Sequence, residues 1–539
     1  MKRFFIASIF TMFGVAFASS RGATDLLYEF PDNQRMVDFW TSPDLAHWYA
    51  KVEVTDSTGS FWAVIIDGQM GAQYDAVGRV IPFYRAGSGE GDTSVFRVAY
   101  EARGGEYWYV VVDMKEGLKY DGIRDILFSP SGDQLAYVAG QGEKYMVVNY
   151  YGIKKPTKYD EIQSLTFSPD GAHLAYRAVS KGKEFVVLDD KEGEKFDWVF
   201  NIAFSADGKH IAYRAEKGGT EFVVLDGNQG TKFDDVQAIT FAAGGTRLAY
   251  KAEKAGKSCV VADSRKGPSY DWVQDITFSP GGSRLVYLAK AGEKSFIVAD
   301  GNEGPGHGGV QAVLFSPDGS RLAYEASDGD REMVILDSKP DKYYDDVSDL
   351  VFSPDGSHLA YRAREGGKRF VVMDGKEEPR YDDVWNIIFN PGDRDRSVGA
   401  QGSPMVYIAQ ERDKRFVVSS GQEGPRYDDV WGILFSPDGA SMVYKAKKGD
   451  RRFVVVDGKE DPKYDDIQDM VFAPIVHEGE KPVLAYRARK KGLEIVVVER
   501  KEGPGYSAIY GPVFNTDGSV LTYLAFSGKK LYRVAMNTE

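Results

Sequence analysis

Aspartates beside aromatic residues are the first side chains whose type and spacing could do chemistry. An aromatic residue followed by aspartate stands eight residues ahead of a phenylalanine at nine places, and some aspartates are doubled, as in Asp382-Asp383. A ring of such carboxylates would collect cations such as calcium, whereas a carboxylate where a strand begins would accept backbone N–H bonds. Because the pair recurs so often, we expect the structural role. The nine aspartates are Asp121, Asp160, Asp197, Asp234, Asp271, Asp345, Asp382, Asp428 and Asp465.

One stretch, GPGHGG, breaks this pattern and carries His307 where the other repeats carry an aromatic residue. Its glycines Gly304, Gly306 and Gly309 match the spacing GxGxxG, which in dinucleotide-binding proteins joins a strand to a helix. No helical periodicity follows it here. We therefore expect a loop with an exposed His307 and no nucleotide site.

Signatures of the common enzyme classes are missing from the sequence. It contains no GxSxG, no GxxxxGKS or GxxxxGKT and no HExxH, and its six histidines are scattered. The single cysteine, Cys259, excludes an intramolecular disulfide and a cysteine-based zinc site. We therefore expect no catalytic residue, no metal ligand and no cofactor. A hydrolase or lyase that acts on peptides or polysaccharide is the alternative, because two acids suffice for such chemistry.

The elements that must position these residues recur with a period of 37 residues. A phenylalanine ahead of a turn-forming sequence such as SPDG marks each repeat, and from Phe167 to Phe389 every step between these anchors is 37 residues. The later steps are 46, 37 and 42 residues, and Trp40 and Phe83 are two degenerate anchors, which gives about thirteen repeats. The regular anchors are Phe128, Phe167, Phe204, Phe241, Phe278, Phe315, Phe352, Phe389, Phe435, Phe472 and Phe514.

Each repeat reads as four short strands. Valine, isoleucine, phenylalanine and tyrosine fill runs such as LAYRA and FVVMDG, and glycine, proline and aspartate separate them. Four strands in about 37 residues predict an all-β fold made of β-propeller blades. Natural propellers have about four to eight blades, so we expect tandem β-propellers with about 12–13 four-stranded blades. The first would cover residues 19–271 with about 6 blades and the second residues 272–539 with about 7, and residues 25–30 (DLLYEF) would close a distant blade.

The pattern FSPDGxxLAY, as in the sequence FSPDGSHLAY from Phe352, resembles the WD40-like repeats called PD40. Such repeats occur in TolB-type periplasmic propellers and in the propeller domains of prolyl-oligopeptidase-type enzymes. The resemblance covers nearly the whole chain after its N-terminus and implies a propeller fold without implying a function. Because the repeats begin by about residue 36 and continue to the last residues, we expect neither the α/β domain of TolB-type proteins nor the hydrolase domain of the peptidases.

Charge and the N-terminal residues limit the partners. The 67 basic and 80 acidic residues give a net charge of −13, which disfavours binding to nucleic-acid phosphates. Residues 1–18 start with Lys2 and Arg3, continue with a short apolar run and end with Ala16 and Ala18, the pattern of a cleaved secretory signal peptide. We therefore expect a periplasmic or secreted protein with no membrane span after signal cleavage.

The residue four positions ahead of the anchor varies most between the repeats, and it is polar or aromatic in each. Either a binding surface or the packing between blades would explain this variation. Aromatic side chains supply much of the energy of a binding site, so we expect an exported, non-catalytic scaffold that binds a protein, peptide or glycan at a propeller mouth. An architectural subunit of a larger envelope or extracellular assembly is a further alternative. The candidate binding residues are Trp385, Trp431 and Phe200 at this position, together with Trp198 and Trp272, which stand two residues earlier in their repeats.

Overall fold

The computed structural model describes residues 23–87, 93–149, 157–391, 405–474 and 482–538, and every regular element in them is a β-strand. The strands form thirteen antiparallel sheets, of which twelve have four strands. One sheet has three strands within the described residues, namely β10 (Gly122–Phe128), β11 (Leu135–Gln141) and β12 (Lys144–Asn149). The predicted all-β fold of blade-like sheets is confirmed. The expected signal peptide, residues 1–18, lies outside the described residues. Among the residues described, no helix is long and apolar enough to cross a membrane.

The first strand of each regular repeat ends at its anchor phenylalanine, because the sequence that follows turns the chain. In the turn after β17 the hydroxyl of Ser205 donates to Asp207 Oδ1 (2.6 Å) and accepts the backbone N–H of His210 (3.0 Å). These bonds confirm the structural role predicted for the SPDG-type sequence. The first strands are β2 (Gln34–Thr41), β6 (Ala76–Arg85), β10 (Gly122–Phe128), β13 (Glu161–Phe167), β17 (Trp198–Phe204), β21 (Asp235–Phe241), β25 (Trp272–Phe278), β29 (Gly309–Phe315), β33 (Asp346–Phe352), β37 (Asp383–Phe389), β41 (Asp429–Phe435), β45 (Asp466–Phe472) and β49 (Ala508–Phe514).

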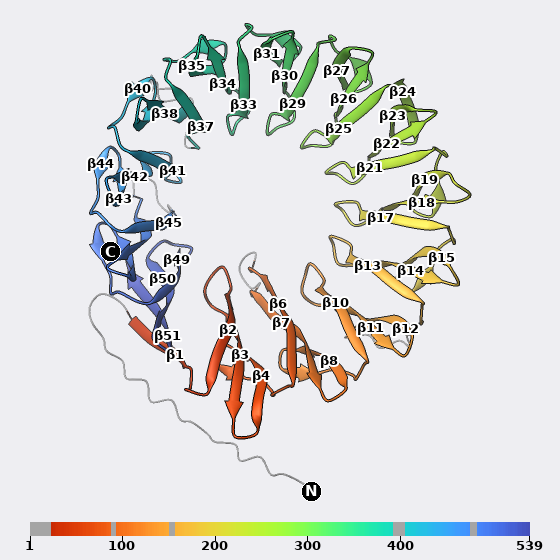
Figure 1. The fold of residues 1–539 in the computed structure, drawn as a ribbon, viewed down its shortest axis with the longest axis vertical. Coiled ribbons are helices and arrows are strands. Elements are labelled where there is room, and N and C mark those ends of the chain that lie inside the picture. The colour runs from red at the N-terminus through yellow and green to blue at the C-terminus, as the bar shows by residue number, and fades with distance from the viewer. Residues whose placement is uncertain (1–22, 88–92, 150–156, 392–404, 475–481, 539) are drawn as a thin grey trace. The chain divides into compact units, whose positions relative to one another are not determined.

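The remaining strands of a sheet follow the first as a simple meander. After β17 come β18 (Ile211–Glu216), β19 (Glu221–Leu225) and the two-residue β20 (Asn228–Gln229), paired in that order. The preceding and following sheets repeat this order, with β14 (Leu174–Ser180), β15 (Lys183–Leu188) and β16 (Lys191–Glu192) in one, and β22 (Leu248–Lys254), β23 (Lys257–Ala262) and β24 (Arg265–Tyr270) in the other. In Figure 1 the sheets that begin with β13, β17 and β21 lie side by side in chain order.

The core lies between successive sheets. Tyr213 of β18 belongs to one apolar cluster with Ala175 and Val186, which come from β14 and β15 of the preceding sheet. Ala212 of β18 in turn packs in a cluster with Tyr250 of β22. The Leu-Ala-Tyr motif thus places a small side chain of one sheet near a large one of the next, which fills the interface at the density of a protein interior.

The chain divides into two compact units, and one of them contains both ends of the described chain. This unit comprises residues 1–55, 64–70 and 431–539, and the other comprises residues 56–63 and 71–430. Within the first unit, β1 (Ala23–Glu29) pairs antiparallel with β51 (Lys530–Asn537), which pairs with β50 (Val520–Ser527), so that β1 completes the sheet β1-β51-β50-β49. The prediction that residues 25–30 add a strand to a distant sheet is confirmed.

The expected boundary at residue 271 lies inside the second unit. There the cluster that contains Tyr270 and Val273 also contains Ala249 and Tyr287, so the sheets on either side of residue 271 pack as other neighbouring sheets do. The division into two propellers at this residue stays a prediction.

Candidate functional site

A bulge in the first strand sets the direction of the candidate binding side chains. In β17 the pairing with β18 shifts between Phe200 and Ala203, and Asn201 has a φ angle of 52°. A left-handed residue inside a strand is typical of a β-bulge, which bends the strand and redirects the neighbouring side chains. The position has a positive φ in every regular repeat, and its other residues are Asp125, Ser164, Ala238, Asp275, Ala312, Asp349, Asn386, Gly432, Asp469 and Gly511.

The predicted residues Trp198 and Phe200 meet on one face of β17. Their rings are stacked, with centroids 6.3 Å apart and an angle of 16° between the planes, and Trp198 is 51% exposed. The guanidinium of Arg214 lies over Phe200, with Cζ 4.4 Å from the ring centroid. Arg214 Nη1 also donates to the carbonyl of Val236 in the next sheet (2.7 Å). The exposed indole of Trp198 therefore stacks on Phe200, and Phe200 is held in turn by Arg214, which is bonded to the next sheet.

Trp385 repeats part of this arrangement on β37. The guanidinium carbon of Arg415 lies 5.2 Å from the Trp385 ring, and Arg415 Nη1 binds Asp429 Oδ1 (2.5 Å). Trp385 is half-buried. A cation held over an indole face stabilises it by about 0.5–2 kcal/mol.

The other two predicted tryptophans are placed differently. Trp272 packs against the apolar cluster that contains Leu288 and Ile297, so its ring contributes to the packing between sheets. Trp431 lies half-buried on β41 in the first compact unit. Trp272 stands two residues ahead of the variable position, whose side chains are half-buried in some repeats, as Trp431 is, and exposed in others; the exposed ones include Arg124, Gln237, Gln274 and Gln311.

The recurrent aspartates are part of the scaffold, as predicted. Asp197 accepts the N–H of Gly218 in the hairpin of its own sheet (2.8 Å) and binds Lys183 Nζ (2.5 Å). The Lys183 ammonium and then the Gly218 N–H lower the pKa of Asp197. Backbone N–H groups at the same position bind Asp75, Asp121, Asp160, Asp234, Asp271, Asp345, Asp382 and Asp465. Across the described parts of the chain, no group of three or more His, Cys, Asp or Glu side chains could hold a metal ion.

The prediction of an exposed His307 is wrong, because the histidine occupies the interior position that other repeats fill with an aromatic ring. His307 is 7% exposed, and its backbone pairs with Ser295 as the aromatic residues pair elsewhere. His307 Nδ1 lies 2.9 Å from Asp328 Oδ2, and the N–H of Gly308 donates to the other carboxylate oxygen (3.0 Å). The hydrogen bond from His307, with burial opposing it, lowers the pKa of Asp328 to about 2. Asp328 thus replaces the aspartate that this repeat lacks.

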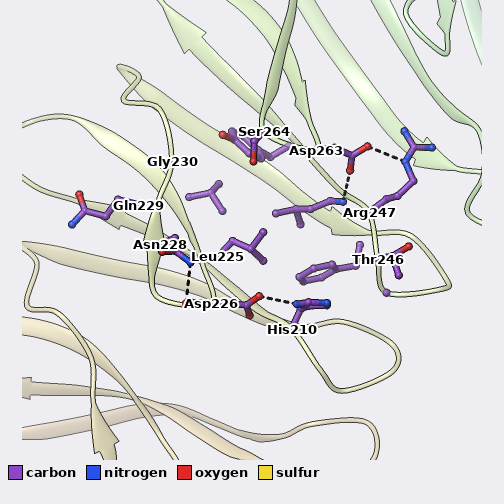
Figure 2. A pocket seen from close by; sticks show the side chains of 15 residues that line it. His210, Leu225, Asp226, Asn228, Gln229, Gly230, Thr246, Arg247, Asp263 and Ser264 are labelled. Atoms are coloured by element: carbon purple, nitrogen blue, oxygen red, sulfur yellow. Dashed lines mark hydrogen bonds and ion pairs between the residues drawn. The ribbon is translucent and has the colours of Figure 1, made fainter.

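Clefts between neighbouring sheets were not predicted; one of about 330 Å³ is lined by Ser441, Asp461 and Arg500 among others, and two more adjoin histidines. The larger of these two, with a volume of about 590 Å³, lies between the sheet of β18 and the sheet of β22 and is lined by His210, Asp226, Phe241, Arg247 and Tyr250 among others. Figure 2 shows His210 turned toward Asp226, and Arg247 turned away toward Asp263. The smaller cleft, of about 380 Å³, lies one sheet earlier and is lined by His173, Phe204 and Tyr213.

A signal for the two clefts beside histidines is present in the sequence. Four of the six histidines stand at the same place in the repeat, one residue ahead of the second strand, where three other repeats carry Arg247, Arg284 and Arg321. Each forms an ion pair or hydrogen bond through Nδ1 with the aspartate that follows the third strand, at 2.6–2.8 Å. The four are His47, His173, His210 and His358.

One buried carboxyl group stands apart from the scaffold pattern. Glu325 on β30 (Leu322–Asp328) occupies the place of Arg214 in its repeat and is 6% exposed. Burial is the main cause that raises the pKa of Glu325 to about 7; nearby carboxylates such as Glu332 contribute to the rise, and a hydrogen bond from Gln311 opposes it. A glutamate with this pKa changes charge near neutral pH.

No family model matches the chain, and no curated protein matches it. Among solved structures, a eukaryotic initiation factor is 12% identical with a TM-score of 0.29, over 69% of this chain and 96% of that one. The β-propeller domain of Cps50 (Swd1) from Myceliophteria thermophila is 15% identical with a TM-score of 0.21, over 47% and 95%. An oligogalacturonate lyase in complex with manganese is 11% identical with a TM-score of 0.23, over 55% and 96%. Likeness at this level says nothing about ligand or activity, and the resemblance to PD40 and TolB-type repeats stays a prediction.

Proposed function

We propose that this protein is an exported, non-catalytic scaffold that binds a protein, peptide or glycan at the bulged first strands of its sheets. The observation that carries the proposal is the exposed indole of Trp198, stacked on Phe200 and supported by Arg214. An aromatic ring held in place before binding loses little conformational entropy when a partner covers it. Such rings are the side chains that most often dominate binding energy.

The surroundings of Trp198 suit a partner that carries both apolar and polar groups. The bulge residue Asn201 beside it is exposed, and so is Gln237 at the equivalent variable position of the next sheet. Amide side chains both donate and accept hydrogen bonds, so they can match peptide groups or sugar hydroxyls. For this reason β17 and β21 form one part of the recognition surface that we propose on the first strands, and Trp385 on β37 forms another.

Export rests on the pattern of residues 1–18, which predicts cleavage after Ala18. Mass spectrometry of the N-terminal peptide from the native host checks this point. A mature chain that begins at Ser19 in the envelope or secreted fraction supports export, and an intact N-terminus in the cytoplasm contradicts it.

Alanine variants test the binding surface. Trp198→Ala and Trp385→Ala are expected to weaken partner capture at least tenfold each, since removal of an anchoring aromatic side chain costs about 2 kcal/mol or more. Tyr107→Ala is the matched control, because Tyr107 is also exposed (44%) but lies on β8 (Tyr107–Val112), the third strand of its sheet. Capture that survives both tryptophan variants with the fold intact would contradict the proposal. Turnover of a peptide or polysaccharide substrate would instead indicate an enzyme.

A further inference from the structure

Arginines of this chain show what the space between two sheets accommodates. Arg247 binds Asp263 of its own sheet through Nε (3.0 Å), and its Nη1 donates to the carbonyl of Ser283 in the turn of the next sheet (2.6 Å). Its guanidinium carbon lies 5.1 Å from the centroid of the anchor ring Phe278. Arg284 and Arg321 make the same three contacts in the two following sheets. A planar cation therefore joins each of these sheets to its neighbour.

Histidine supplies only the first of these contacts. His210 Nδ1 binds Asp226 Oδ2 (2.7 Å), as Arg247 Nε binds Asp263, and His173 binds Asp189 in the same way (2.7 Å). Within the described residues, no arginine or lysine lies over the next anchor rings, which are Phe241 and Phe204. The imidazole is shorter than the arginine side chain, and the two clefts lie at two of the four places where histidine stands.

A glycine in place of a larger residue also helps to keep each cleft open. Gly230 and Gly193 stand where a later repeat carries Asp341, whose carboxylate binds the hydroxyl of Tyr361. The hydroxyls of Tyr250 and Tyr213 lie 3.6 Å and 3.8 Å from the place that a Cβ at Gly230 and Gly193 would occupy.

Burial, the larger cause, raises the pKa of each of these tyrosines to about 12, and the oxygen of the neutral hydroxyl can accept a hydrogen bond from a cation.

We infer that the two clefts bind the guanidinium group of arginine side chains from a partner. Each cleft contains the face of an anchor phenylalanine ring and the turn of the next sheet, which are the two groups that contact an arginine of this chain in the later sheets. In the larger cleft Asp226 and Asp263 face Arg247, so its charge favours a cation, whereas in the smaller cleft Glu192 and Asp226 are balanced by Lys191 and Lys209. The net charge of −13 attracts basic ligands over longer distances. The inference concerns a site separate from Trp198 and stands without the proposed function.

The test uses N-acetyl-arginine amide as the probe and N-acetyl-citrulline amide, which has the same shape without the charge, as its control. Titration followed by NMR is expected to show two sites for the arginine probe and binding at least tenfold weaker for citrulline. The variant His173→Arg/His210→Arg places the chain's own guanidinium in each cleft and is expected to abolish binding of the probe. Equal binding of citrulline, or unchanged binding to the folded double variant, would overturn the inference.

The converse variant, Arg284→His, keeps the pair with Asp300 and uncovers the ring of Phe315, and its repeat has Gly304 and Tyr324 as in the natural clefts. It is expected to add a third site, and a count that stays at two would contradict the inference. Phe241→Leu keeps an apolar side chain but removes the ring, and it is expected to weaken the larger site tenfold if the fold is retained.

A peptide with two arginines distinguishes two possible sources of the guanidinium group, a partner chain and a free guanidinium compound. Binding at least tenfold tighter than that of the amide probe assigns the clefts to a partner chain, and equal binding assigns them to a free guanidinium compound. Both outcomes support the guanidinium site, and failure of both probes to bind overturns it.

Discussion

Replacing Glu325 by glutamine is expected to stabilise the protein above neutral pH and to have little effect near pH 4.5. Glu325 is buried where sibling sheets carry arginine, and its charged form lies close to Glu332 and other carboxylates. The folded state therefore keeps the carboxyl protonated after the unfolded chain has lost the proton. Glutamine preserves the shape of the neutral carboxyl group and can still bond to Gln311, but it never has to carry the charge.

The magnitude follows from the pKa. A rise from the ordinary 4.5 to about 7 corresponds to about 3 kcal/mol at about 1.36 kcal/mol per pKa unit. Because the folded state binds more protons than the unfolded state between these values, the free energy of unfolding falls as the pH rises through this window and is constant above it. The Glu325→Gln variant does not lose stability in this way. The difference between its free energy of unfolding and that of the native protein therefore grows from near zero at pH 4.5 to about 3 kcal/mol at pH 7.5.

Urea unfolding followed by tryptophan fluorescence at a series of pH values measures this difference. Hydrogen exchange of residues 309–336, which cover β29, β30 and β31 (Arg331–Leu336), shows whether the change is local. Glu143→Gln, at an exposed glutamate, controls for the loss of a charge as such. A stability difference between Glu325→Gln and the native protein that does not change with pH would refute the reasoning.

Two further predictions concern the scaffold. Ser205→Ala removes a buried hydroxyl and leaves the N–H of His210 without its partner, so it is expected to lower the free energy of unfolding by about 1–2 kcal/mol, measured by urea unfolding; the natural Ala242 at the corresponding position indicates that the variant will fold. An equal stability would contradict the role given to the turn. Deletion of residues 23–30 removes β1 and is expected to lower the melting temperature and to speed hydrogen exchange in β51, whereas unchanged exchange there would contradict the pairing.

The fold was largely predictable because one interaction pattern is repeated. Strand residues, turn residues and the anchor phenylalanine recur together, so each repeat supports the interpretation of the others. The strand from residues 25–30 was also predictable, since an apolar run ahead of the first repeat needs a partner. The packing across residue 271 could not be read in the same way, because the sequence of a repeat is the same whether its neighbour belongs to its own propeller or not.

The candidate site was predictable only in part. Aromatic residues at the variable position were recognised, but the bulge beside them was not, because Asn201 or Ala238 in a strand has no distinct pattern until its φ angle is known. His307 was misread because an exchange of aromatic for histidine was taken as the loss of an interior residue. The clefts depend on how far His210 and Arg247 reach toward the next sheet, which is a matter of side-chain length and geometry.

Photo-crosslinking from the first strands tests the proposed recognition surface most directly. A photoreactive residue at Gln237, exposed on β21, is expected to crosslink a partner in cells that produce the protein from its own gene. The same residue at Tyr107 on β8 is expected to give no crosslink to that partner. A partner that crosslinks from Tyr107 and not from Gln237 would contradict the proposal that the bulged first strands form the binding surface.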